Sequence, residues 1–107
     1  MNEYQKKAFD TSKITHMDHP VVYSVMGLCS EAGEVAGKIK KIFRDKGGYV
    51  SEADMNDLMK ELGDCLWYIA DTCSRLGFDL QEVADMNIEK LQSRKERGVI
   101  AGDGDNR

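Results

Sequence analysis

Apolar residues recur every three or four positions along most of the chain, which is the spacing of one face of an α-helix. The longest stripe predicts a helix over residues 20–45 and consists of Val21, Val25, Leu28, Ala32, Val35, Ile39 and Ile42. A second stripe predicts a helix over 51–76 and consists of Met55, Leu58, Leu62, Cys65, Ile69 and Cys73. Shorter stretches predict helices over residues 2–15 and 79–98. The pattern therefore predicts an all-α protein.

Residues typical of helix ends support these boundaries. Pro20 suits the first position of a helix, where its missing N–H costs nothing. Gly47 suits the left-handed conformation that ends one. Ser51, followed three residues later by Asp54, resembles a capping box, and Asp79 is a good N-cap.

The length of 107 residues predicts a single domain over residues 1–107, with a helical core of about 20–97. Residues 98–107 are too rich in glycine for a helix. This tail is either disordered or reaches a phosphate or a neighbouring subunit through polar residues, which are Asp103, Asp105, Asn106 and Arg107. The apolar arc of the third helix exceeds half its circumference, which suggests contact with another subunit.

Composition excludes several classes of protein. The net charge of -4, with both signs interspersed, argues against binding to a nucleic acid polymer. No apolar run approaches the roughly 18 residues of a membrane span. The odd number of cysteines, three, argues against a disulfide framework and for a reducing compartment, so we expect a cytoplasmic protein.

Two tetrapeptides, 30 residues apart, place pairs of carboxylates on helix faces. They are Glu31-Ala-Gly-Glu34 and Glu61-Leu-Gly-Asp64, and each puts two acids three residues apart around a glycine. The like charges repel, and glycine within a helix costs about 0.5–1 kcal/mol relative to alanine. Such acid pairs are often no more than a solvated face. Their duplication at the edge of an apolar stripe instead favours a divalent cation held between two helices.

The ligand chemistry favours Mg²⁺, with Mn²⁺ as the alternative, because the set is all oxygen and contains no convergent His or Cys. Cations, an amide and one aromatic ring continue along the same helix edges, and these are Lys38, Lys41, Tyr68, Asn87, Lys90 and Arg94. A metal–polyphosphate ligand needs such neighbours, and the ring can stack on a base. The alternative for the basic residues is simple pairing with acids along their own helices.

The sequence resembles the MazG-like nucleoside triphosphate pyrophosphohydrolases. The resemblance rests on three motifs, which are Ser30-Glu-Ala-Gly-Glu-Val-Ala-Gly-Lys-Ile-Lys-Lys41, Lys60-Glu-Leu-Gly-Asp-Cys-Leu-Trp-Tyr68 and Asn87-Ile-Glu-Lys-Leu-Gln-Ser-Arg94. It implies a four-to-five-helix antiparallel bundle that is completed by oligomerisation into a homodimer or homotetramer.

The resemblance also implies an enzyme that cleaves a ribo- or deoxyribonucleoside triphosphate between the α and β phosphates. Glu31, Glu34, Glu61 and Asp64 would bind Mg²⁺, and one of them, or a water held by the metal, would deliver the nucleophile. Asn87, Lys90 and Arg94 would bind phosphate. Two alternatives stay open: a hydrolase of the same fold acting on another nucleotide diphosphate such as a phosphoribosyl-ATP, and a non-catalytic helical dimerisation module.

Overall fold

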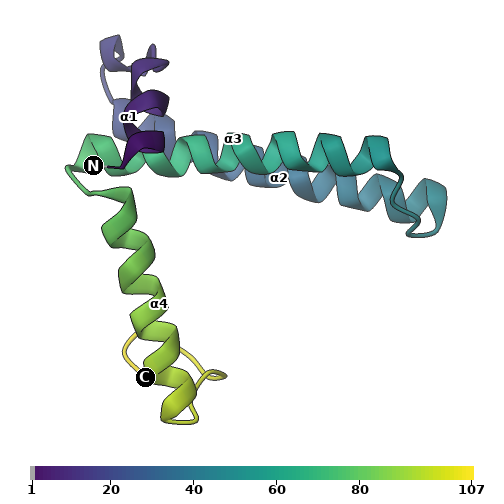
Figure 1. Cartoon of the computed structure of the whole chain (residues 1–107). Helices are drawn as coiled ribbons and strands as arrows, with labels where there is room; N and C mark the ends of the chain where they lie inside the picture. Colours follow the sequence, from purple (N-terminus) through teal and green to yellow (C-terminus); the bar gives the residue numbers. More distant parts are fainter. Residues whose placement is uncertain (1) are drawn as a thin grey trace.

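The computed structural model describes residues 2–107, and all the regular structure in this range is helical (Figure 1). The elements in chain order are α1 (Glu3–Asp10), the short 3₁₀-helix η1 (Ile14–His16), α2 (Pro20–Lys46), α3 (Glu52–Leu76) and α4 (Leu80–Glu96). The predicted all-α class is confirmed.

The helix ends follow the predicted chemistry. Helix α2 begins at Pro20 and ends before Gly47, which has a φ of 61°. Before α3, the Ser51 hydroxyl accepts from the Asp54 N–H at 3.1 Å, and the Asp54 carboxylate accepts from the Ser51 N–H at 3.0 Å. The Asp79 carboxylate caps α4 by accepting from the N–H of Gln81 at 2.8 Å.

The first helix is shorter than predicted. A single helix over residues 2–15 is wrong, because α1 ends at Asp10 and a separate turn, η1, follows it. The Thr11 hydroxyl donates to the carbonyl oxygen of Ala8 at 2.7 Å, and the Ser12 hydroxyl accepts from the Ile14 N–H at 3.4 Å. Such short polar side chains compete with the helix for backbone groups and end it early.

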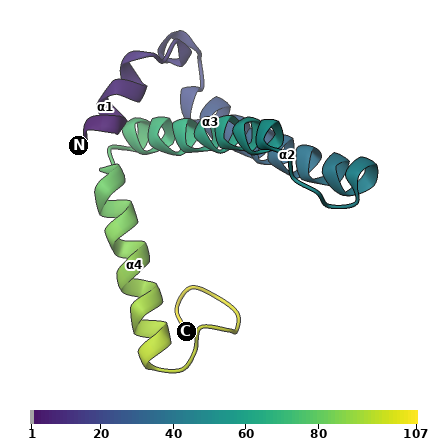
Figure 2. The ribbon, with the colours of Figure 1, turned by 45° about the vertical axis from the view of Figure 1, so that its right-hand side comes forward.

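Helices α2 and α3 form a long antiparallel hairpin, and α1 packs against α3 at the end of the hairpin that holds the start of α2 (Figure 1). Helix α4 leads away from the hairpin in both ribbon views (Figure 2). Within one chain, therefore, α4 does not pack along the hairpin, and the bundle that the sequence predicts is incomplete.

The two helices of the hairpin meet along a line of polar and small residues, which we call the polar seam. It comprises Ser24, Gly27, Glu31 and Lys38 of α2 and Glu61, Asp64, Tyr68 and Asp71 of α3. The predicted apolar stripes lie mostly outside it, and the hydrophobic residues that are buried among those described are Ala8, Ile14, Ile42, Ala70 and Cys73. Of the two predicted stripes, only Ile42 and Cys73 are buried within one chain, whereas residues such as Met55 (58%) and Leu62 (57%) are exposed.

A buried ion pair closes one end of the polar seam. Asp71 is fully buried, and its Oδ2 accepts from the Ser24 hydroxyl at 2.8 Å and from Arg75 Nε at 3.3 Å. Arg75 also donates to the Ser12 hydroxyl at 2.9 Å, and its guanidinium lies 4.7 Å from the centre of the Phe9 ring. Because breaking one partner of a buried pair strands the other charge, this cluster ties the loop after α1 to the hairpin.

Gln5 joins α1 to the turn between α3 and α4. Its side chain is fully buried, and its amide nitrogen donates to the Phe78 carbonyl oxygen at 2.8 Å and to the Ser74 hydroxyl at 3.1 Å. Its amide oxygen accepts from the Leu80 N–H at 2.8 Å. The Gln5 side chain therefore pairs with backbone groups on both sides of Asp79, in the turn between α3 and α4.

Replacing this side chain tests its role. We expect Gln5→Ala to lower the free energy of unfolding by about 2 kcal/mol, because it leaves partly buried backbone groups without partners. The matched control is Gln81→Ala, since Gln81 is an exposed glutamine whose side chain donates to Asp85 on the same helix. Chemical denaturation measures both, and equal effects would contradict the assignment.

Candidate functional site

The structure brings three of the four predicted acids together in the middle of the hairpin. Glu31 of α2 and Glu61 and Asp64 of α3 each place one carboxylate oxygen within 4.8 Å of the others. Glu31 and Glu61 are half-buried, and Asp64 is exposed. We call these three residues the acidic cluster.

The packing of the polar seam explains why these residues meet. Tyr68 lies one turn from Asp64, and its ring packs directly over Gly27, one turn from Glu31. A Cβ atom at Gly27 would lie 2.2 Å from the Tyr68 ring, so this close approach needs glycine. The antiparallel register that seats Tyr68 on Gly27 also sets Glu31 beside the acids of α3.

Glu34 lies outside the acidic cluster. It is exposed, although its charge still contributes to the electrostatic environment of Glu31. The glycines of the two acidic motifs, Gly33 and Gly63, have nothing within 4 Å of an added Cβ, and the same holds for Gly37. Of the glycines in α2, only Gly27 therefore permits close approach of helices within this chain.

The carboxyl groups of the cluster destabilise one another's charges. Partial burial raises the pKa of Glu31 above its usual value, and the nearby carboxylates of Asp64 and Glu61 raise it further. A raised pKa in an acid means that its protonated form is stabilised relative to its ionised form. The cluster therefore favours the uptake of positive charge. Either a proton or a cation can supply that charge.

The donor set fits a hard divalent cation. The acidic cluster offers carboxylate oxygens from both helices and contains neither histidine nor cysteine. Oxygen ligands of this kind suit Mg²⁺ and Mn²⁺, which also keep water or phosphate oxygens in their coordination sphere. The exposed position of Asp64 leaves the site open on one side for such ligands.

One of the two predicted lysines of α2 reaches the cluster. Lys38 Nζ lies 3.7 Å from Glu61 Oε1, and both side chains are partly screened from solvent. Lys41 is exposed and instead lines a small pocket of about 180 Å³ with Lys46 and Asp54, farther toward the closed end of the hairpin. Lys38 is therefore the cation nearest to the acids within this chain.

A groove of about 460 Å³ begins at Glu31 and is lined by aromatic and apolar side chains. Its lining comprises Tyr23, Met26, Gly27, Ser30, Glu31 and Tyr68. Burial raises the pKa of Tyr68, and the neighbouring Tyr23 and Glu31 raise it further, so its hydroxyl stays protonated at neutral pH. The sequence predicted a role for Tyr68 but missed Tyr23 and Met26, which lie among apolar positions without a motif.

The structure does not bring the predicted residues of α4 to the acidic cluster. Asn87 and Lys90 line a separate, mostly apolar groove of about 560 Å³ that starts at Phe78. Arg94 is only 4% exposed and donates hydrogen bonds to the loop after α4. Because α4 leads away from the hairpin, its cations and the acids form two separate groups in one chain (Figure 2).

The sequence left open whether residues 98–107 are disordered or reach a phosphate or a neighbouring subunit, and the structure places them against α4. The Asp105 carboxylate lies 3.2 Å from Lys90 Nζ and 3.3 Å from Arg94 Nη2. These two cations hold the pKa of Asp105 below its usual value, so it is ionised at neutral pH. The loop therefore folds back on α4 and contacts the basic residues that the sequence assigned to phosphate.

No helix in the described part of the chain combines the length and hydropathy needed to cross a membrane. No solved structure is significantly similar to this chain. The Gene 37 protein of Mycobacterium phage L5 is 53% identical over 85 residues, which cover 79% of this chain and 75% of that protein.

That relative's name describes no activity, so the family assignment rests on the match to a family model. The family model of the MazG nucleotide pyrophosphohydrolase domain matches residues 24–99, a range that contains the acidic cluster and all of α4. The chain belongs to the MazG nucleotide pyrophosphohydrolase family.

Proposed function

We propose that this protein is a Mg²⁺-dependent pyrophosphohydrolase that cleaves a nucleoside triphosphate between the α and β phosphates. The observation that carries the proposal is the acidic cluster, whose three carboxylates from two helices converge within 4.8 Å in a chain of the MazG family. A solvated acidic face would spread such charges apart, because like charges at this distance repel.

Glu31, Glu61 and Asp64 would hold the ion, and Glu34, whose charge already acts on Glu31, would join them. When bound, Mg²⁺ or Mn²⁺ supplies a Lewis acid that polarises phosphoryl oxygens and offsets their charge. The carboxylates of the chain also act as proton acceptors.

Other residues of the chain would bind the remainder of the substrate. The groove beside Glu31 offers Tyr68, Tyr23 and Met26 to a nucleoside, and base stacking on an aromatic ring suits this lining. Lys38 borders the cluster and offers an ammonium to phosphate oxygens. Lys90 and Asn87 would offer their polar groups to the leaving pyrophosphate, whose charge grows as the bond breaks.

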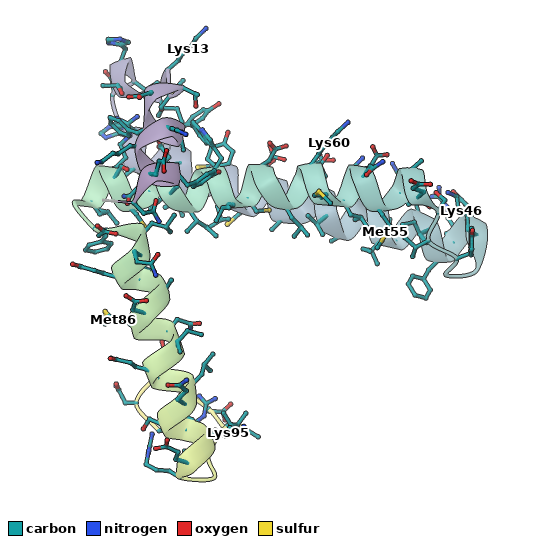
Figure 3. All side chains as sticks on the ribbon, in the orientation of Figure 1. Lys13, Lys46, Met55, Lys60, Met86 and Lys95 are labelled. Atoms are coloured by element: carbon teal, nitrogen blue, oxygen red, sulfur yellow. The ribbon has the colours of Figure 1, made fainter. Side chains whose placement is uncertain are left out.

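We infer that a second copy of the chain brings these two groups together. Large apolar side chains are exposed along α3 and α4, including Met59 (69%), Leu62 (57%) and Met86 (70%). Met55 and Met86 project freely from the hairpin and from α4 in Figure 3. Exposed apolar surface of this extent is typical of protein interfaces.

The geometry of one chain favours an exchange of α4 helices. Helix α4 has apolar residues around its circumference and hardly touches its own hairpin, so it lacks the partner that a helix of this kind needs (Figure 1). The hairpin lacks cover on its apolar faces. If α4 of one copy covers the hairpin of another, Lys90 and Asn87 approach the acids of the second copy. The same assembly would then bury the exposed apolar surfaces and complete the substrate site.

Product analysis tests the proposed reaction. We expect the protein with Mg²⁺ to convert at least one common ribo- or deoxyribonucleoside triphosphate to its monophosphate and pyrophosphate. Glu61→Gln should lower turnover by at least about a hundredfold, because it removes a charge from the acidic cluster. Anion-exchange chromatography of the nucleotides, together with separate assays for pyrophosphate and orthophosphate, gives the result.

Each alternative has its own outcome. Release of orthophosphate would contradict cleavage between the α and β phosphates, and activity on phosphoribosyl-ATP alone would indicate the related hydrolase. Inactivity on every nucleotide would favour a non-catalytic module. Glu52→Gln is the matched control, because Glu52 is an exposed acid in the first turn of the same helix.

Mixing two impaired variants tests whether the site lies between copies. We expect Glu61→Gln and Lys90→Ala to be nearly inactive alone and to recover about a quarter of wild-type activity after they are mixed, unfolded and refolded together. Half of the random dimers are then mixed, and each of these holds one intact site. No recovery, despite mixed assembly shown by native mass spectrometry, would place both groups in one chain.

A further inference from the structure

Residues 98–107 form an ordered loop that is held by interlocking arginines. Arg107 donates to the carbonyl oxygens of Val99 at 3.1 Å and Ile100 at 2.7 Å, and also to that of Gly104. Arg97 donates to the Arg107 carbonyl oxygen at 2.7 Å. Each end of the loop is therefore fastened to the other.

Glycines give this loop its path. Gly98, Gly102 and Gly104 have φ values of 71°, 132° and 82°, which other residues rarely adopt. Their positions let the chain reverse after α4 and return along it. A loop that depends on three such turns and on several charged hydrogen bonds has a defined conformation.

Arg94 lies inside this loop. Its Nη2 donates to the Asp105 carbonyl oxygen at 2.7 Å and to the Gly104 carbonyl oxygen at 3.3 Å, and it also contacts the Asp105 carboxylate. Because its side chain is 5% exposed, a phosphate in solution cannot reach it without displacing the loop. The bonds of Arg94 suit a residue that holds the loop together.

Lys90 lies one turn before Arg94 and is accessible. Its side chain is 37% exposed, and Asp105 is the acceptor that its ammonium contacts at 3.2 Å. The same oxygen of Asp105, Oδ1, contacts both Lys90 Nζ and Arg94 Nη2, so Arg94 holds the carboxylate at the place where Lys90 meets it. A long, flexible lysine gains a preferred direction from such a contact.

We propose that the loop over residues 98–107 is a positioning element of the substrate site, in which Arg94 fastens the loop and Asp105 orients the ammonium of Lys90 toward substrate phosphate. The inference rests on the proposed function for the role of Lys90. It assigns Arg94 to the loop in place of the direct phosphate contact that the sequence suggested. It also makes Asp105 a positioning residue, because it acts through Lys90.

The contact between Asp105 and Lys90 could instead be competitive. In that role the Asp105 carboxylate would occupy the place of a substrate phosphate beside Lys90 and would be displaced when substrate binds. The hydrogen bonds favour positioning. Asp105 is held by Arg94 through its backbone carbonyl as well as its carboxylate, and the surrounding loop is fastened independently by Arg107. These backbone bonds keep Asp105 beside Lys90, and displacing its carboxylate would also break the side-chain contact with Arg94.

A double-mutant cycle distinguishes the roles. With the nucleoside triphosphate that the wild type hydrolyses fastest, we expect Asp105→Asn to lower kcat about tenfold, since the ammonium loses its orientation. In the Lys90→Ala background the same change should have less than about a twofold effect. Asp103→Asn is the matched control, because Asp103 is an exposed acid of the same loop, and it should leave kcat unchanged.

A substrate-free measurement keeps this inference separate from the proposed reaction. We expect ¹⁵N relaxation of the Lys90 ammonium to show a restricted side chain in the wild type and in Asp103→Asn, and a more mobile one in Asp105→Asn. If the wild type hydrolyses no nucleotide, the proposed function fails, and this measurement alone decides whether Asp105 orients Lys90.

Three results would overturn the positioning role. An Asp105→Asn variant with a lower KM and unreduced kcat would indicate a competing carboxylate. An equal loss of kcat with and without Lys90 would indicate a purely structural contribution of the loop. Unchanged mobility of the Lys90 ammonium in Asp105→Asn would show that the contact does not hold the side chain.

Discussion

The polar seam is the constraint on which the rest of the structure depends. Two antiparallel helices meet through Ser24 and Asp71 at one end and Gly27 and Tyr68 in the middle, and this register forces Glu31 against the acids of α3. Like charges so close together oppose helix packing unless positive charge joins them. Partial burial raises the pKa of Glu31 and the neighbouring carboxylates raise it further, and a divalent cation would relieve the repulsion between them.

The polar seam also determines what the chain leaves exposed. Because α2 and α3 use polar edges to meet each other, much of their apolar surface faces outward, and α4 leaves the hairpin with its own apolar residues uncovered. Within one chain, α4 leads away from the hairpin that holds the acidic cluster (Figure 2). In the proposed exchange of α4 helices, the same contacts between copies would cover the apolar surfaces and bring the basic residues of α4 to the acids.

The helices and their ends could be predicted from the sequence, because neighbouring residues determine them, whereas the contacts between distant residues could not be predicted. Pro20, Gly47 and the Ser51–Asp54 capping box fix helix ends through neighbouring residues, and these were confirmed. The spacing of the acidic motifs likewise placed Glu31, Glu61 and Asp64 correctly together. The buried role of Gln5 and the contact of Asp105 with Lys90 depend on residues brought together by tertiary structure, which helical periodicity does not encode.

The most direct test of the account is to locate a bound ion. We expect crystals grown with Mn²⁺ to show one strong anomalous peak between α2 and α3, within about 2.5 Å of carboxylate oxygens of Glu31, Glu61 and Asp64. The peak should vanish in the Glu61→Gln variant, while the positions of its helices stay the same as in the wild type. A well-ordered acidic cluster without an anomalous peak at saturating Mn²⁺, or a peak only at other acids, would contradict the central claim that the polar seam is a metal site.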